Sequence, residues 1–512
     1  MLIARGLVRP LCRPCSRAWS APIQRGVSRA FASNSKGAPP SIDAMPLPCV
    51  DQHEIRQRQM QQGGGKRVSD ETSKVEENDI LGPEPSYTNV VSGYHTYIHD
   101  KPFPLDYGNV LPSFQIAYET WGTLNADQSN AILLHTGLSA SSHAASSPSN
   151  TSKGWWEEFI GPGKTLDTNR FFVICTNVLG SCYGSTGPSS PHPLDPTGAP
   201  YATRFPVLSI FDMVRAQFCL LDHLGIEKLY ASIGSSMGGM QSIAAAHLFR
   251  DRVERVVSIS GCARSSPSGI ALRFAQRSVL MADENWKRGF YYGPDNVPPH
   301  KGMKLARQIA TITYRSGPEW EQRFGRERRS LLRDASSPAQ QAPALCPDFL
   351  VETYLDHQGE QFCLKYDANS LIYISKTMDL FDMTYEALAE LGARRFDAHG
   401  DDGHLPIEPV EHVHEHTPRR RQHITTISHP GAHAYVPSLA RGLHRLRDVP
   451  ILILGVQSDI LFPVEQQREL AECIRMNGNP SVMYYEIDAP HGHDSFLIDV
   501  ANVGGAIKGF LN

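Results

Sequence analysis

The sequence of 512 residues lacks several features that would assign it to a particular class of protein. It has no uninterrupted apolar run near the ~18 residues that a membrane-spanning helix needs. It has no basic excess, because 49 Lys and Arg stand against 53 Asp and Glu, so a nucleic-acid partner is not indicated. Its ten cysteines are scattered rather than spaced as a disulfide framework, and no internal repeat is visible. The composition is therefore that of an ordinary globular chain, long enough to bury a large core.

Acidic residues are also absent from the N-terminus, where the first is Asp43. The preceding segment is rich in Arg and contains Ser, and such leaders are typical of mitochondrial transit peptides. A secretory signal is not indicated, because the segment has no continuous apolar stretch of ~7–15 residues. We expect a transit peptide over residues 1–40, which would direct the protein to the mitochondrial matrix; the alternative is a disordered basic tail. The polar stretch 41–90, with "QQGGGKR" and "GPEPS", reads as a linker.

From residue 91 onward, short apolar runs alternate with helical patterns, as in "SIFDMVRAQFCLLDHLG". This alternation predicts an α/β fold with a mostly parallel sheet covered by helices on both faces. A stretch richer in charge and helix formers, 265–447, interrupts it, so we expect a core of 91–264 and 448–512 with an inserted helical lid. Polar segments near 326–350 and 390–445 are not expected to pack. The runs expected to form strands are "YHTYIHD", "SFQIAYETWG", "NAILLHTGL", "RFFVICTNVLG", "KLYASIGSS", "VERVVSISG", "VPILILGVQSD" and "SVMYYEID".

A His-rich tract in the second polar segment invites comparison with a metal site. It contains His412, His414 and His416, but no cysteine joins them, and the alternating His and Glu are flanked by Pro. A solvated loop accounts for this composition, so no metal site is expected.

The stretch "YASIGSSMGGMQSIAAAHL" places a G-x-S-x-G motif between a strand pattern and a helix pattern. That context is the one a nucleophile elbow requires, with Ser236 held out of the sheet by a sharp turn. The Met237 N–H at the helix start, and the Leu138 N–H in the loop after "ILLHTG", would then bind an oxyanion. The alternative is an ordinary glycine turn between strand and helix.

A serine nucleophile needs a base and an acid that orients the base. In this kind of sheet they follow in the order Ser, Asp, His, and both come from strand ends. Asp459 ends the run "ILILGVQSD", and His493 follows "YYEIDAP". We therefore expect His493 to accept the Ser236 proton and Asp459 to fix its tautomer. His491, two residues earlier, is the alternative histidine.

Several longer strings resemble the homoserine/serine O-acyltransferase family of α/β-hydrolase-fold enzymes. They are "NVLGSCYGSTGPSSPHP", "FDMVRAQ", "GSSMGGMQ", "ARQIATITYRSG", "SDILFP" and "HGHDSFL". The resemblance implies an α/β-hydrolase fold with a helical lid and a ping-pong reaction. Ser236 takes an acyl group from an acyl-coenzyme A and passes it to an amino-acid hydroxyl. The acyl-coenzyme A is a co-substrate, and no permanently bound cofactor is implied.

The resemblance also implies roles for further residues. Arg277 would bind the α-carboxylate of the acceptor, Asp494 would hold its ammonium group, and Tyr292 would line the pocket. Family members are often dimers, so a homodimer is a further expectation.

The acceptor and donor are less sharply indicated. Homoserine enzymes of the family usually carry glycine where Ser235 stands, so the form "GSSMGGM" favours L-serine. With the leader, this resembles the fungal mitochondrial serine O-acetyltransferases, so acetyl-coenzyme A and a role in cysteine synthesis are expected. Serine with succinyl-coenzyme A, and homoserine with acetyl-coenzyme A in methionine synthesis, are the alternatives. An esterase or thioesterase would use the same three residues, whereas an inactive binding module would need one of them to be missing.

Overall fold

The computed structural model describes residues 91–328, 347–400 and 434–512. The expected transit peptide and linker lie outside the described residues, as do parts of both polar segments. The His-rich tract with His412, His414 and His416 also lies outside them.

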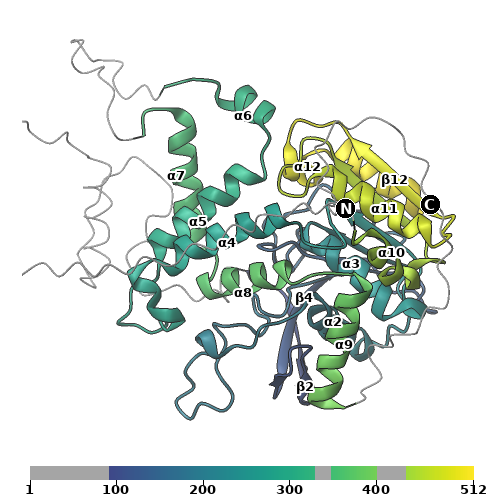
Figure 1. Ribbon diagram of the computed structural model, residues 1–512, viewed down its shortest axis with the longest axis horizontal. Coiled ribbons are helices and arrows are strands. Elements are labelled where there is room, and N and C mark those ends of the chain that lie inside the picture. The colour runs from purple at the N-terminus through teal and green to yellow at the C-terminus, as the bar shows by residue number, and fades with distance from the viewer. Residues whose placement is uncertain (1–90, 329–346, 401–433) are drawn as a thin grey trace, which may run out of the picture. The chain divides into compact units, whose positions relative to one another are not determined.

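The centre of the fold is an eight-stranded sheet with the order β1-β4-β8-β5-β9-β10-β11-β12 (Figure 1). Each of the eight apolar runs forms one of its strands, which confirms the α/β prediction. β4 runs antiparallel to both of its neighbours, and the pairs from β8 to β12 are parallel. In chain order the strands are β1 (His95–His99), β4 (Phe114–Trp121), β5 (Ala131–His135), β8 (Phe172–Thr176), β9 (Ala231–Ser235), β10 (Val256–Ile259), β11 (Ile451–Val456) and β12 (Val482–Ile487).

The core lies on both faces of this sheet, because successive side chains of a strand point to opposite sides. In β5, Leu133 belongs to one buried cluster, while Ile132 and Leu134 belong to another. All five residues of β5 and all five of β9 are buried. Strands covered on both faces read as continuous apolar runs, which explains why the sequence revealed them.

Helices cover the two faces of the sheet. The first of them, α2, is capped by Ser209, the residue before its first turn. The Ser209 hydroxyl accepts a hydrogen bond from the Asp212 N–H at 2.9 Å, and Asp212 Oδ2 accepts one from the Ser209 N–H at 2.8 Å. This reciprocal cap satisfies two donors that a helix start leaves open. The helices of the core are α2 (Ile210–His223), α3 (Met237–Leu248), α10 (Val436–Gly442), α11 (Val464–Met476), α12 (Ser495–Ile498) and α13 (Gly505–Leu511).

The stretch between β10 and β11 is helical, as expected. Figure 1 shows α4 to α8 gathered beside the sheet rather than on its faces. The last helix of the group, α9, instead packs on α10 and is tied to the core, since Arg395 forms an ion pair of 3.0 Å with the buried Asp106. The helices are α4 (Pro267–Met281), α5 (His300–Thr313), α6 (Gly317–Phe324), α7 (Leu350–Cys363), α8 (Ala368–Asp379) and α9 (Tyr385–His399).

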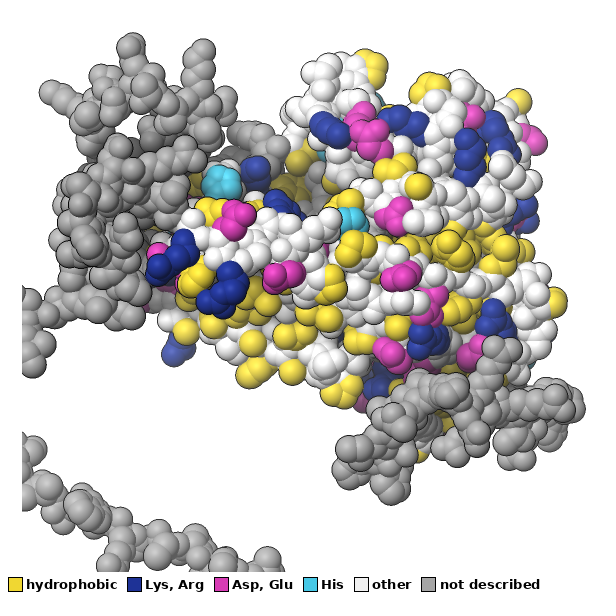
Figure 2. All heavy atoms as spheres, turned by 90° about the horizontal axis from the view of Figure 1, so that it is seen from above, with side chains coloured by type: hydrophobic (Ala, Val, Ile, Leu, Met, Phe, Trp, Pro, Cys, Tyr) yellow, Lys and Arg dark blue, Asp and Glu magenta, His cyan; other side chains and the backbone are white. Residues whose placement is uncertain are grey.

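The remaining elements are short. They are β2 (Phe103–Pro104), β3 (Val110–Leu111), β6 (Ile160–Gly161), β7 (Leu166–Asp167), η3 (Ala202–Arg204), η4 (Arg250–Arg252), η5 (Glu284–Gly289), η7 (His444–Leu446), η8 (Gly492–Asp494) and η9 (Val500–Gly504). In the described part of the chain, no helix is both long and apolar enough to cross a membrane. On the face drawn in Figure 2, basic and acidic side chains are interspersed, in keeping with the formal net charge of −4.

Candidate active site

Ser236 occupies the sharp turn between β9 and α3. Its φ is +59°, a backbone conformation that non-glycine residues rarely adopt. The glycines on either side permit the turn because the backbones nearly touch there. A Cβ on Gly234 would lie 2.1 Å from the Gly238 carbonyl oxygen, and one on Gly238 would lie 2.3 Å from that of His135. The motif therefore forms a strained strand–turn–helix junction of the kind that presents a nucleophile.

His493 and Asp459 lie together at the carboxyl edge of the sheet. Asp459 follows β11, and its Oδ2 lies 2.6 Å from Nδ1 of His493 in η8. The other oxygen, Oδ1, accepts the backbone N–H groups of Leu461 and Phe462 at 2.9 Å each. Because the carboxylate accepts, Nδ1 carries the proton, which leaves the Nε2 lone pair free to accept one.

The orientation of His493 is fixed further by its neighbours. Its ring stacks on Phe462 with a centroid separation of 5.1 Å, and the ring is buried. Nε2 has no hydrogen-bond partner among the described residues. His493 and Ser236 both line one cavity, whereas the alternative histidine, His491, does not line it.

This cavity has a volume of about 320 Å³ and lies between the edge of the sheet and the inserted helices. The size suits a small amino acid or a short acyl group. Its walls come from the loop after β5, the turn at Ser236, helices α4, α5, α7 and α8, and the segment around His493. The lining residues used below are Gly137, Leu138, Ser139, Ala140, Trp155, Ser236, Arg273, Arg307, Arg315, His493 and Asp494.

The two predicted oxyanion donors flank Ser236. Met237 is the first residue of α3, and Leu138 lines the cavity from the loop after β5. A Cβ built on Gly137 would lie 3.9 Å from Cβ of Ser236, so this loop passes directly beside the serine. The Tyr366 hydroxyl donates to the Leu138 carbonyl at 2.7 Å and ties the loop to the segment before α8.

Charged side chains of both signs face the cavity. Arg307, on α5, forms no salt bridge with any residue of 91–328, 347–400 or 434–512, and its guanidinium lies over the ring of Phe362 at 4.4 Å. Asp494, next to His493, lies 3.4 Å from Arg315. Burial raises the pKa of the Asp494 carboxyl above its ordinary value, and the positive charge of Arg315 opposes this rise.

The structure places two of the expected substrate-binding residues away from the cavity. The Arg277 guanidinium pairs with Asp379 and contacts Ser375, and it does not line the cavity. The Tyr292 hydroxyl donates to the buried Asp367 at 2.9 Å and does not line it either. Asp494, in contrast, lies beside His493 in the cavity wall.

The cavity contains three arginines to which the sequence assigned no role: Arg273, Arg307 and Arg315. Arg307 and Arg315 both lie in the string "ARQIATITYRSG", which carried part of the family resemblance. That string was the available signal. It could not show which of its side chains would face the cavity.

Comparisons with known proteins place the chain in a family. A family model described as the alpha/beta hydrolase fold matches residues 130–500. A serine O-succinyltransferase of Schizosaccharomyces pombe is 54% identical over 486 residues, covering 91% of this chain and 94% of its own. One from Emericella nidulans is 56% identical over 445 residues, covering 84% of this chain and 83% of its own.

Solved structures show the same fold. The homoserine O-acetyltransferase of Bacillus anthracis is 25% identical with a TM-score of 0.64, and covers 82% of this chain and 98% of its own. Esterase E22 is 25% identical with a TM-score of 0.63, and covers 82% of this chain and all of its own. The chain therefore belongs to the α/β-hydrolase fold family and, within it, to the homoserine and serine O-acyltransferases.

Proposed function

We propose that this enzyme is a serine O-succinyltransferase that uses Ser236, His493 and Asp459 as its catalytic triad. The observation that carries the proposal is the pairing of an acyl-transfer site with groups that match an amino acid. Arg307, which forms no salt bridge with any described residue, and Asp494 line the same cavity as Ser236 and His493. An α-amino acid carries one charge of each sign, so Arg307 binds its carboxylate and Asp494 its ammonium group.

The reaction proceeds in two halves. Ser236 Oγ attacks the thioester carbonyl while its proton moves to His493 Nε2; the C–S bond then breaks, and coenzyme A leaves with that proton. In the second half, the serine substrate gives its hydroxyl proton to His493 Nε2 and attacks the acyl-enzyme. The ester bond to Ser236 breaks, and Ser236 Oγ recovers the proton. The N–H groups of Leu138 and Met237 stabilise the oxyanion in both halves.

The succinyl donor is favoured by the balance of charge at α4. Arg273 and Arg277 share the single carboxylate of Asp379, and all three side chains are buried. These three side chains together therefore carry one net positive charge, and Arg273 borders the cavity. A succinyl group brings a terminal carboxylate that can balance this charge, whereas an acetyl group brings none. The names of the relatives from S. pombe and E. nidulans point the same way. Acetyl-coenzyme A, the donor expected from the sequence, thereby becomes the alternative donor. A supply of activated serine for cysteine synthesis is part of the proposal.

Coenzyme A release by the purified full chain tests the proposal. Succinyl- and acetyl-coenzyme A are each supplied with L-serine, L-homoserine or no acceptor. We expect the fastest release with succinyl-coenzyme A and L-serine. Preference for homoserine would assign the enzyme to the other branch of the family. The two acceptors differ by one methylene, worth only ~1–3 kcal/mol in a pocket. Equal release without any amino acid would identify a hydrolase.

Replacing Arg307 with leucine should selectively damage the second half-reaction. The loss of a charge-assisted bidentate contact is expected to lower kcat/KM for L-serine by roughly 10–100-fold. The burst of coenzyme A from the first half should stay within about threefold of wild type, because Arg307 contacts the acceptor rather than the donor. Stopped-flow detection of free thiol separates the two phases.

Arg277→Leu, made in parallel, tests the role inferred from family resemblance. Arg277 is already paired with Asp379, so we expect little change in the use of serine. A selective loss in the Arg277 variant, with Arg307→Leu unaffected, would assign the acceptor carboxylate to Arg277 instead.

We also propose that residues 1–40 direct the protein to mitochondria. A fusion of residues 1–40 to a fluorescent reporter should colocalise with a mitochondrial dye, and a diffuse cytosolic signal would rule the targeting out.

We further propose that the enzyme is a homodimer. Light scattering measures the mass of the purified chain in solution, and the mass of a monomer would rule out the dimer.

A further inference from the structure

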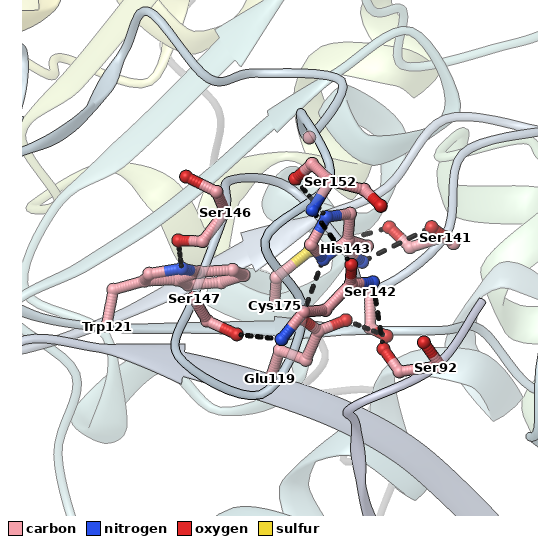
Figure 3. A network of polar contacts seen from close by, with 12 residues as sticks. Ser92, Glu119, Trp121, Ser141, Ser142, His143, Ser146, Ser147, Ser152 and Cys175 are labelled. Carbon is pink, nitrogen blue, oxygen red and sulfur yellow. Dashed lines mark hydrogen bonds and ion pairs between the residues drawn. The ribbon is translucent and has the colours of Figure 1, made fainter.

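The loop that follows β5 is tied to a distant strand by a buried polar network (Figure 3). Glu119 lies on β4, which β8 separates from β5 in the sheet. Its Oε1 accepts the hydroxyl of Ser142 at 3.0 Å, and its Oε2 lies 2.9 Å from Nδ1 of His143. The loop therefore crosses the end of β8 to reach β4, and Glu119 and His143 are both buried.

The partners of His143 determine where protons must lie. Its Nε2 is 2.9 Å from the Ser152 carbonyl oxygen, which can only accept, so Nε2 carries a hydrogen. On the other side, one proton must lie between Nδ1 and Oε2, whether it belongs to the imidazole or to the carboxyl. Without that proton, two acceptors would face each other in a buried place, which is costly. The pair is thus satisfied only when it shares one proton.

This network connects directly to the wall of the active-site cavity. The His143 carbonyl accepts the backbone N–H of Trp155 at 3.3 Å, and the Ser141 carbonyl accepts its indole N–H at 2.9 Å. Trp155 lines the cavity, and so do residues 137–140, which precede the network in the same loop. At its start the loop passes beside Ser236, as the 3.9 Å approach of Gly137 shows. One end of the loop is therefore at the nucleophile and the other is fixed to Glu119.

We propose that Glu119 and His143 are positioning residues for acyl transfer, which hold the Leu138 N–H and Trp155 in place beside Ser236. The inference rests on the proposed function, since it assigns a support to the oxyanion site of that reaction. Neither side chain lines the cavity, so both act through the loop rather than on the substrate. A displacement of about 1 Å at a reacting centre can cost on the order of 10²-fold in rate.

Two substitutions at Glu119 separate hydrogen bonding from charge. Glu119→Ala leaves the Ser142 hydroxyl and the His143 ring without their partner, and we expect acylation of Ser236 to slow by about 10²-fold. Glu119→Gln can accept from Ser142 through its oxygen and donate to Nδ1 of a neutral His143 through its amide. We therefore expect Glu119→Gln to retain acylation within about threefold of wild type. Ser142→Ala, which removes one hydrogen bond and little volume, should slow acylation by roughly fivefold and serves if Glu119→Ala does not fold.

The readout is the pre-steady-state burst of p-nitrophenol from p-nitrophenyl acetate, measured on the full chain beside the coenzyme A burst. The small ester reports acylation of Ser236 whatever the natural substrates are. A wild type that reacts with the ester and with no acyl-coenzyme A would overturn the proposed function while leaving this test valid. The burst rate and KM are both measured, and we expect the variants to lower the burst rate while KM changes little.

Asn479→Ala is the matched control for stability. Asn479 is buried, and its side chain donates to the Leu446 and Val449 carbonyls at 2.7 and 2.8 Å, at the end of the sheet away from the cavity. The Asn479→Ala substitution should lower the melting temperature of the protein without slowing the p-nitrophenol burst. If Glu119→Ala or Ser142→Ala slows acylation no more than this control does, the positioning role is refuted. An equal loss in Glu119→Gln and Glu119→Ala would also refute it, because the loss would then follow from charge rather than from the held loop.

Discussion

Replacing Ser236 with alanine should abolish the burst of coenzyme A and lower kcat on the order of 10⁶-fold. Without Oγ no covalent intermediate forms, and the remaining oxyanion donors cannot supply a nucleophile. Alanine occupies the same positive-φ position as serine with the same strain, so the melting temperature should change little. Mass spectrometry of the chain mixed with succinyl-coenzyme A should show an added succinyl group in wild type and none in the variant.

A second serine on the adjoining helix provides the control. Ser242 lies in α3, is buried, and donates its hydroxyl to the Gly239 carbonyl at 2.9 Å, outside the cavity. Ser242→Ala should keep the burst. An acylated Ser236→Ala variant would mean that another side chain is the nucleophile.

Replacing Asp459 with asparagine should lower kcat by about 10⁴-fold while leaving the fold intact. Two backbone N–H groups, of Leu461 and Phe462, donate to Oδ1 of Asp459. In the variant they would bind the amide oxygen of asparagine, so its NH₂ group would face His493. Nδ1 would then accept rather than donate, and the ring proton would move to Nε2. A histidine with a proton on Nε2 cannot accept one from Ser236.

Steady-state kinetics with both substrates and a thermal melt measure the effect. Asp499→Asn is the matched control, because the Asp499 carboxylate caps a neighbouring turn through Asn502 and lies outside the cavity. It should leave kcat unchanged. A loss below tenfold in Asp459→Asn would contradict the role of Asp459 in fixing the tautomer of His493.

The sheet, and the grouping of the polar residues that follow its strands, could be predicted from the sequence for a physical reason. Buried parallel strands need apolar side chains on both faces, so their runs stand out, and their carboxyl ends meet at one edge. Residues that follow such runs are therefore brought together whatever the length of chain between them. Asp459 and His493 came from this reasoning, and their 2.6 Å contact lies at that edge.

The arginines of the cavity could not be assigned in the same way. Arg273 and Arg277 are four residues apart on α4 and lie on one side of the helix, so periodicity treats them alike. Both arginines pair with Asp379 on α8, and it is the packing of α4 against α8 that places Arg273 at the border of the cavity. Likewise, nothing in the sequence joins Glu119 to His143, because their contact depends on a loop that crosses an intervening strand.

The strained turn at Ser236 has a consequence for attempts to engineer this enzyme. A left-handed conformation costs a non-glycine residue on the order of 1–3 kcal/mol, and glycine would relieve most of that cost. A selection for heat resistance alone would therefore favour Ser236→Gly, the substitution that removes the proposed nucleophile. Directed evolution of this chain should therefore screen for catalytic activity in every round, because the most thermostable variants would include inactive ones.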